Sequence, residues 1–300
     1  MEKPYILHMI TTEKNLSPFD ANMAMDAGWT SVVPYTMVET SEVQGLVQDA
    51  IFSRGPKGVK RTALFLGGRD TEQAMAMLSI AQESMVPPFE ISAFADPSGA
   101  FTTAAGMVAA VEKELINKHN SSLQGANVLV LGGTGPVGQA AAVLSAKAGA
   151  NVTIIGRQLE KSQRIAKLVN ELFGDAKTNI QGDTDTNKPE LMKTADVVYA
   201  TAAAGIQVLD SDQMATAPQL KVAADVNAVP PSGIAGLDAM HNGTPIPGSN
   251  SGATGIGALA IGNVKYHAQN GLLNRMRTTD RPVFLHFEHA FEVAREFVNK

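Results

Sequence analysis

The sequence predicts an α/β fold of two domains, each built on a mainly parallel β-sheet. In the first third of the chain, short apolar segments alternate with segments of helical periodicity, a pattern typical of parallel sheets covered on both faces. Further on, residues 127–155 read as a strand, a glycine-rich turn, an alanine-rich helix and a second strand. The 300 residues are enough for two domains of ordinary size.

Each expected element of the first domain has a local signal. Ser17 is placed as an N-cap and Pro18 stands at the first helical position, so a helix begins there and ends before Gly28. Residues 55–58 (Gly-Pro-Lys-Gly) are expected to break the preceding helix. The expected strands span residues 4–10, 29–35, 62–66 and 91–95, and the expected helices residues 18–27, 43–52 and 71–83, with another helix after residues 96–99.

The polar segment 118–125 is expected to link a first domain, residues 1–122, to a second, residues 123–269. Residues 182–188 are polar and read as a loop, and residues 233–257 are rich in Gly, Pro and Asn, which favours a binding loop. The remaining strands are expected at residues 127–131, 151–155, 195–205 and 220–225, and the helices at residues 139–149, 158–173, 256–273 and 287–298.

Composition excludes several classes of protein. The net charge is −5, and no block of Lys and Arg suggests a nucleic-acid partner. The chain has no cysteine, hence no disulfide, thiolate metal site or cysteine nucleophile. No apolar run reaches the about 18 residues that span a bilayer, and the N-terminus does not read as a secretory leader. We therefore expect a cytoplasmic protein without a membrane partner.

The glycine-rich turn after the strand at residues 127–131 carries the first functional signal. Gly133, Gly135 and Gly138 have the GxGxxG spacing that allows a tight turn, close approach of a pyrophosphate and close packing of helix on strand. The helix N-terminus that follows supplies free N–H groups for phosphates. A structural turn is the alternative. The context favours a Rossmann-like dinucleotide site that also includes Thr134, Pro136 and Val137.

Arg157 stands where such a site selects its cofactor. Sites selective for NAD generally place an acid at the end of the second strand, whereas an Arg accommodates the 2′-phosphate of NADP. A solvated arginine at a helix start is the alternative. Gln158 is neutral and can bond either ribose, so the sequence predicts both NADP and NAD as cofactors.

Two later strand ends belong to the same predicted crevice. Small side chains at Ala202 and Ala203 would let a nicotinamide ring lie against backbone. Asp225 or Asn227 could bond the carboxamide of that ring, although turn capping explains Asp225 equally well.

Lys265 lies within the apolar run from residue 256 to residue 268. It either snorkels at a helix edge or faces a pocket. His286 and His289 are three residues apart, but no third ligand stands beside them, so no metal site is expected.

Several motifs together resemble the bacterial methylene-tetrahydromethanopterin dehydrogenases. They cover nearly the full length, and the details are most similar to the branch that accepts both NAD and NADP. The matching segments are Ser-Pro-Phe-Asp at 17–20, residues 48–54, Phe-Leu-Gly-Gly at 65–68, residues 96–103, the glycine turn, Asp-Val-Asn-Ala-Val-Pro-Pro at 225–231 and residues 257–265.

The resemblance implies an N-terminal substrate domain, a helix at about residues 270–300 that returns to it, a substrate cleft between domains and homo-oligomers. It also implies that Phe19 stacks on the pterin or aryl ring, that Thr103 positions the substrate and that Lys265 is the key polar residue. Asp96, Asp20 and Gln269 are expected to bind the substrate, although turn chemistry at Asp96-Pro97 explains Asp96 nearly as well. Two alternatives stay open: oxidation of methylene-tetrahydrofolate, and a sensor that binds NADP without catalysis.

Overall fold

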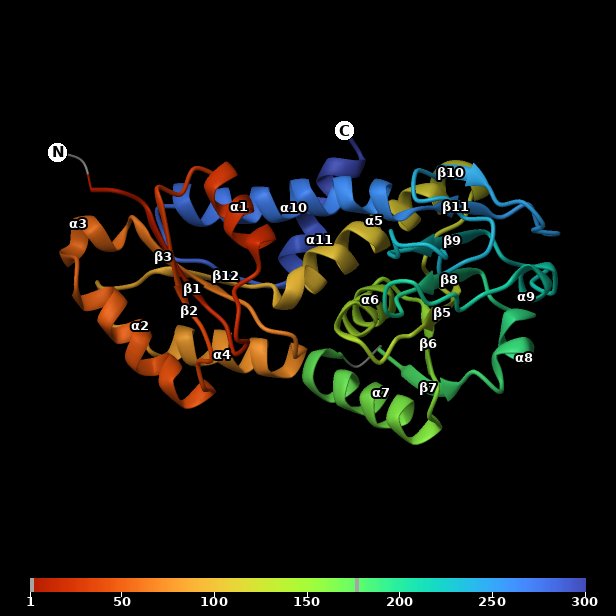
Figure 1. Ribbon diagram of the computed structural model, residues 1–300, viewed down its shortest axis with the longest axis horizontal. Coiled ribbons are helices and arrows are strands. Elements are labelled where there is room, and N and C mark those ends of the chain that lie inside the picture. Colours follow the sequence, from red (N-terminus) through yellow and green to blue (C-terminus); the bar gives the residue numbers. More distant parts are fainter. Residues whose placement is uncertain (1–2, 176–177) are drawn as a thin grey trace. The chain divides into compact units, whose positions relative to one another are not determined.

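The computed structural model describes residues 3–175 and 178–300, and the chain divides into two compact units (Figure 1). Unit 1 comprises Met1–Thr102 and Tyr266–Val293, and unit 2 comprises Thr103–Lys265 and Ala294–Lys300. Residues 1 and 2, part of the stretch read for a leader, lie outside the described residues.

Unit 1 is built on a parallel sheet. In the described part of the chain its five strands follow the order β12-β4-β3-β1-β2. The side chains of β3 are all buried, as expected for a strand covered on both faces. The strands are β1 (Ile6–Ile10), β2 (Ser31–Tyr35), β3 (Thr62–Leu66), β4 (Ser92–Ala95) and β12 (Phe284–Leu285). The helices are α1 (Pro18–Asp26), α2 (Val43–Phe52), α3 (Gly55–Val59) and α4 (Thr71–Glu83).

Unit 2 contains a sheet of seven strands within the described residues, in the order β10-β11-β9-β8-β5-β6-β7. All of its neighbours are parallel except β10 and β11. The strands are β5 (Asn127–Leu131), β6 (Asn151–Gly156), β7 (Ile180–Thr184), β8 (Val197–Ala200), β9 (Val222–Asp225), β10 (Asn242–Pro245) and β11 (Thr254–Ile256). The helices are α6 (Pro136–Lys147), α7 (Leu159–Phe173), α8 (Lys188–Met192) and α9 (Ser211–Ala215). The chain passes from β5 outward to β7 and then returns to β8, which makes the carboxyl ends of β5 and β8 the point where the strand order reverses.

Three helices contribute residues to both units. The division falls inside α5 (Ala100–His119), α10 (Ala258–Thr278) and α11 (Phe287–Val298). Within unit 1 the rings of Phe101 and Phe287 meet edge to face at 5.2 Å, and within unit 2 Arg295 forms two hydrogen bonds of 2.6 Å with Glu112. The domain boundaries expected near residues 122 and 269 stay a prediction.

The α/β class with a Rossmann-like parallel sheet is confirmed, while several local expectations were wrong. Helix α2 ends before residues 55–58 as expected, although these residues themselves form the short helix α3. The segment 182–188, expected to be a loop, contains the end of β7 and the start of α8. The expected loop 233–257 holds β10 and β11, and α5 extends to His119, into the expected linker. These strands lack an apolar run because they are short or lie at a sheet edge, where side chains are exposed.

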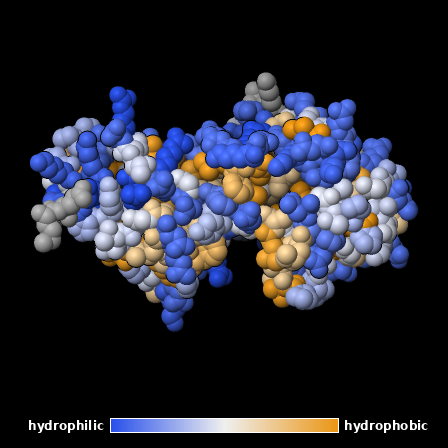
Figure 2. Space-filling view, turned by 90° about the horizontal axis from the view of Figure 1, so that it is seen from above, coloured by the Kyte–Doolittle hydropathy of each residue, from blue (hydrophilic) through white to orange (hydrophobic). Residues whose placement is uncertain are grey.

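The surface in Figure 2 is mainly hydrophilic on the face shown, with apolar side chains in small groups. Among the described residues, no helix combines the length and the hydrophobicity needed to cross a membrane.

Gly182 in β7 provides a test of how closely helix and sheet pack in unit 2. A Cβ atom there would lie 2.3 Å from the backbone carbon of Ser162 in α7, so we expect Gly182→Ala to lower the free energy of unfolding by about 1–3 kcal/mol. In Gly45→Ala, where nothing lies within 4 Å of the added atom and the site is helical, we expect stabilisation by about 0.4–1 kcal/mol. Urea denaturation measures both, and equal stability of the two variants would contradict this packing.

Candidate functional site

The glycine turn after β5 is held by contacts that leave no room for side chains. A Cβ atom on Gly133 would lie 2.7 Å from the carbonyl oxygen of Val130, and one on Gly138 would lie 2.4 Å from the Cα atom of Gly133. Gly132 has a φ of 74°, a conformation that favours glycine. These glycines let α6 begin directly against the end of β5, with its N-terminus at the carboxyl edge of the sheet.

A cavity of about 760 Å³ opens beside this turn, a size suited to a ligand as large as a dinucleotide. It brings together six predicted cofactor-binding residues that follow β5, β6 and β8, namely Thr134, Gly135, Pro136, Arg157, Ala202 and Ala203. A Cβ atom on Gly135 would meet only the carbonyl oxygen of Gly132, at 3.7 Å, so a ligand can approach the backbone there. The remaining lining residues are Gly132, Gly156, Asp185, Lys188, Thr201, Ile206, Gln207 and Val208.

A second cavity, of about 430 Å³, is lined by Thr134, Arg157, Gln158 and Lys161. It shares Thr134 and Arg157 with the larger cavity. Arg157 and Lys161 are exposed, so two cations stand at the end of β6, where a ribose phosphate would lie. Neither cavity is lined by the other four predicted cofactor-binding residues, which are Gly133, Val137, Gly138 and Asn227.

Asp225 and Asn227, at the end of β9, brace the loops around them. The buried Asp225 carboxylate accepts hydrogen bonds from the backbone N–H groups of Asn227 at 2.9 Å, Gly233 at 2.7 Å and Ile234 at 3.2 Å. Burial raises the pKa of Asp225, although these three donors act in the opposite direction. The Asn227 carboxamide donates to Pro231 O at 2.8 Å and accepts from Gly205 N at 3.2 Å. Turn capping thus accounts for Asp225, and the role of Asn227 toward a cofactor stays a prediction.

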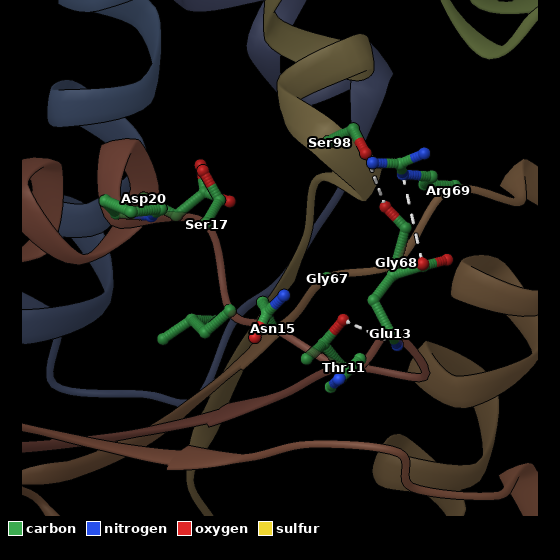
Figure 3. A pocket seen from close by; sticks show the side chains of 12 residues that line it. Thr11, Glu13, Asn15, Ser17, Asp20, Gly67, Gly68, Arg69 and Ser98 are labelled. Atoms are coloured by element: carbon green, nitrogen blue, oxygen red, sulfur yellow. Dashed lines mark hydrogen bonds and ion pairs between the residues drawn. The ribbon is translucent and has the colours of Figure 1, made fainter.

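In unit 1 a polar cavity of about 380 Å³ lies at the carboxyl ends of three strands (Figure 3). Thr11 follows β1, Gly67 and Gly68 follow β3, and Ser98 follows β4. Ser98 has a φ of 53°, and its hydroxyl donates to Gly68 O at 2.8 Å. The other lining residues are Glu13, Lys14, Asn15, Leu16, Ser17, Pro18, Asp20 and Arg69. Among these eight other residues, only Ser17, Pro18 and Asp20 belong to a motif noted in the sequence, the Ser-Pro-Phe-Asp segment.

Two predicted substrate-binding residues pair in this region. Gln269 on α10 donates from its carboxamide to the Asp20 carboxylate at 2.8 Å, and both side chains are buried. Phe19, the neighbour of Asp20 in the first turn of α1, is 47% exposed and presents an apolar ring at the surface. A large exposed aromatic ring beside a polar cavity suits stacking on a flat ligand.

Asp96, predicted to bind substrate, is fully buried and bonded to the start of α5. Its carboxylate accepts from Phe101 N at 2.9 Å, from Thr102 N at 3.2 Å and from the Thr102 hydroxyl at 2.6 Å. These bonds satisfy N–H groups of the first helical turn, which have no partner within the helix. The structure therefore favours the turn chemistry that Asp96-Pro97 suggested.

Thr103 and Lys265 lie on α5 and α10, whose backbones approach closely within unit 2. A Cβ atom on Gly106 would lie 3.0 Å from the backbone nitrogen of Lys265 and 3.1 Å from the carbonyl oxygen of Ile261. Gly106 follows Thr103 by almost one turn on α5, so this glycine lets the segment that carries Thr103 approach the one that carries Lys265. The sequence did not point to Gly106.

The rings of His286 and His289 meet edge to face, with centroids 4.6 Å apart. Burial lowers the pKa of His289. No group of three or more potential ligands stands together in the parts of the chain that the structure describes.

Comparison with known proteins shows which proteins this chain resembles. A family model described as methylene-tetrahydromethanopterin dehydrogenase, N-terminal, matches residues 18–98, and the shikimate / quinate 5-dehydrogenase model matches residues 114–232. An NAD(P)-dependent methylenetetrahydromethanopterin dehydrogenase of Methylorubrum extorquens is 41% identical over 97% of this chain and 98% of its own length. The chain belongs to this dehydrogenase family. The resemblance inferred from the motifs is confirmed.

Two further proteins are less similar to this chain. The Bifunctional protein MdtA of the same organism is 32% identical over 97% of this chain and 98% of its own length. A solved shikimate 5-dehydrogenase from Listeria monocytogenes, in complex with shikimate and NAD, covers 97% of this chain and 96% of its own with a TM-score of 0.54. At 13% identity it supports the fold alone.

The Asp225 bonds lead to a prediction about stability. We expect Asp225→Ala to lower the free energy of unfolding by about 2–4 kcal/mol, because three backbone donors lose a charged acceptor. Asp212→Ala on α9, which removes an exposed carboxylate, should change it by less than about 0.5 kcal/mol. Chemical denaturation measures both, and an Asp225 variant as stable as the control would show that these bonds contribute nothing.

Proposed function

We propose that the chain catalyses NAD(P)-dependent oxidation of N5,N10-methylene-tetrahydromethanopterin to the methenyl form, a step of one-carbon metabolism. The observation that carries the proposal is 41% identity over 97% of the chain to a dehydrogenase named for this substrate. The cavity beside the glycine turn of unit 2 and the polar cavity of unit 1 support it.

The residues of unit 2 fit a dinucleotide, which supplies a nicotinamide ring able to accept a hydride. The backbone of Gly135 and the N-terminus of α6 would hold the pyrophosphate, because a helix N-terminus offers N–H groups that have no partner within the helix and the backbone at Gly135 is accessible. Arg157, Gln158 and Thr134 would hold the ribose end. Ala202 and Ala203, with small side chains, leave space beside the turn.

The substrate itself explains why no strong base or metal is required. The bridging carbon gives up a hydride while the lone pairs of N5 and N10 share the positive charge that develops. The task of the protein is to hold the donor carbon about 3–3.5 Å from its acceptor and to keep it in line. A carboxylate near the carbon would also stabilise the cation, and Asp20, which lines the unit 1 cavity, is a candidate.

The remaining substrate residues have distinct proposed roles. Phe19 would stack on the pterin or aryl ring, and Thr103 would position it. Lys265 and Gln269 are four residues apart on α10 and so share a face of that helix. We assign to Lys265 the anchoring of a substrate oxygen or nitrogen, and to Gln269 the support of Asp20 through their 2.8 Å hydrogen bond.

Initial rates with methylene-tetrahydromethanopterin, using NAD and NADP in turn, test the function directly. A parallel series with methylene-tetrahydrofolate compares kcat/KM for the two pterins. Higher kcat/KM with the folate would assign the chain to that substrate, and cofactor binding without hydride transfer from either pterin would make it a sensor. Self-association and a cytoplasmic location are part of the proposal and stay to be measured by light scattering and cell fractionation.

For Lys265→Met we expect kcat/KM to fall by about 100-fold or more, because the residue that orients the substrate is lost. The dissociation constant for NADP, measured by titration without substrate, should stay unchanged. Arg275→Met removes an exposed cation from the same helix and serves as the control. Ordinary turnover in the Lys265 variant would remove this residue from the site.

For Arg157→Ala we expect KM for NADP to rise about tenfold or more, while KM for NAD changes little. A guanidinium that pairs with a 2′-phosphate contributes about 1.5–3 kcal/mol through charged hydrogen bonds. Arg164→Ala, an exposed residue further along α7, should leave both KM values unchanged. Equal effects on NAD and NADP would mean that Arg157 does not contact the phosphate.

A further inference from the structure

Lys188, the first residue of α8, is a lysine whose side chain is only 9% exposed. Its amino group donates to the carbonyl oxygen of Val208 at 2.7 Å and lies 3.7 Å from the Asp185 carboxylate. Lysines are rarely buried to this degree unless the amino group is paired. Neither the sequence motifs nor the glycine-turn geometry accounts for this residue.

The contact joins two segments that the sheet keeps apart. Lys188 follows β7 and Val208 follows β8, and β5 and β6 stand between those two strands in the sheet. The two segments must therefore lean toward each other to meet. Lys188, Asp185 and Val208 all line the cavity that begins at the glycine turn. The bond thus closes one wall of that cavity.

The Val208 segment is also tied on its other side. Val208 N donates to Gly233 O at 2.8 Å, and Gly233 N donates to the Asp225 carboxylate at 2.7 Å. Val208 is consequently held through its N–H group by the segment after β9 and through its carbonyl group by Lys188. Loss of the lysine would release only one of these two attachments.

The position of the contact indicates which end of the ligand it concerns. In a sheet of this order the ribose of the adenosine half lies at the end of the second strand, here β6 with Arg157. Asp185 and Lys188 follow β7, the strand beyond β6, and so stand further out on the adenosine side. Ile206, 52% exposed, lines the same cavity and offers an apolar surface to a flat base.

We propose that Lys188 is a positioning residue that holds the segment 206–208 over the adenine end of the dinucleotide site. This role rests on the proposed function only for the identity of the ligand. It means that Lys188 contributes to the affinity of the chain for the cofactor. The base lies against Ile206 and Val208, and Lys188 keeps that wall in place through Val208 O. The nicotinamide half, predicted to lie against Ala202 and Ala203 ahead of this segment, does not depend on it.

The test compares the two halves of the cofactor on the full chain by calorimetric titration. For Lys188→Met we expect the affinity for ADP-ribose to fall about tenfold and that for nicotinamide mononucleotide to stay unchanged. In steady-state assays KM for NADP should rise in proportion while kcat is kept. Lys188→Arg retains a donor for Val208 O and should recover part of the affinity. Lys193→Met, which removes an exposed lysine at the end of the same helix, is the matched control.

The outcomes separate the two proposals. A wild-type chain that binds neither ADP-ribose nor NADP overturns the proposed function. A wild-type chain that binds both, with Lys188→Met binding ADP-ribose equally well, overturns the role of Lys188 alone. Equal weakening of both halves would also overturn it, because it indicates a general structural effect. If Lys188→Met does not fold, the comparison uses Lys188→Arg and Lys188→Gln, and the same ratio of the two affinities decides.

Discussion

Backbone-to-backbone packing at the glycine turn is the constraint on which unit 2 depends. Gly138 and Gly133 approach so closely that any side chain would have to displace backbone, and Gly132 packs in the same way on Ala202, whose Cα atom lies 2.6 Å from the Cβ position of the glycine. The first contact brings the start of α6 to the sheet, and the second brings the segment after β8 against the turn. The cavity exists because these two approaches are made without side chains, so small residues at 202 and 203 follow from the turn as much as from the ligand.

Buried acidic residues have two different uses in this chain. Asp96 and Asp225 are buried, and their oxygens accept from backbone N–H groups that would otherwise have no partner. Asp20 is also buried, but it lines a cavity and receives a side-chain donor, Gln269. The distinction separates carboxylates that shape a loop from one that lines a cavity, and residue type alone does not reveal it.

The sequence predicted those parts of the fold whose signals are local. The helices at residues 43–52, 71–83 and 287–298 begin and end as expected, since capping residues and periodicity determine them. The strands β7 and β10 were missed because their exposed residues carry no apolar alternation, and they form only by pairing with neighbours already in place.

In the candidate site, too, the sequence predicted the residues that have a local signal and missed those that do not. The glycine spacing predicted the cavity wall at residues 134–136, and its place at the end of β6 predicted that Arg157 belongs to the same site; Arg157 lines that cavity. Lys188 gave no signal, because a lysine among polar residues reads as solvated until the fold shows that Val208 O lies 2.7 Å away. Burial and long-range pairing are properties of the folded chain, and the residues that depend on them are those that the sequence did not indicate.

Unit 1 is assembled from segments that the ribosome synthesises far apart in time. Strand β12 pairs with β4 across about 190 residues, and the Trp29 indole donates to the Leu273 carbonyl, 244 positions later. At roughly 5–20 residues per second, β4 waits roughly 10–40 s for its neighbour. All strands of the unit 2 sheet have been synthesised before then. During that interval the apolar strand β4 forms an open sheet edge, which favours pairing between nascent chains. A chaperone that covers the edge of β4 at this stage of biosynthesis would prevent such pairing.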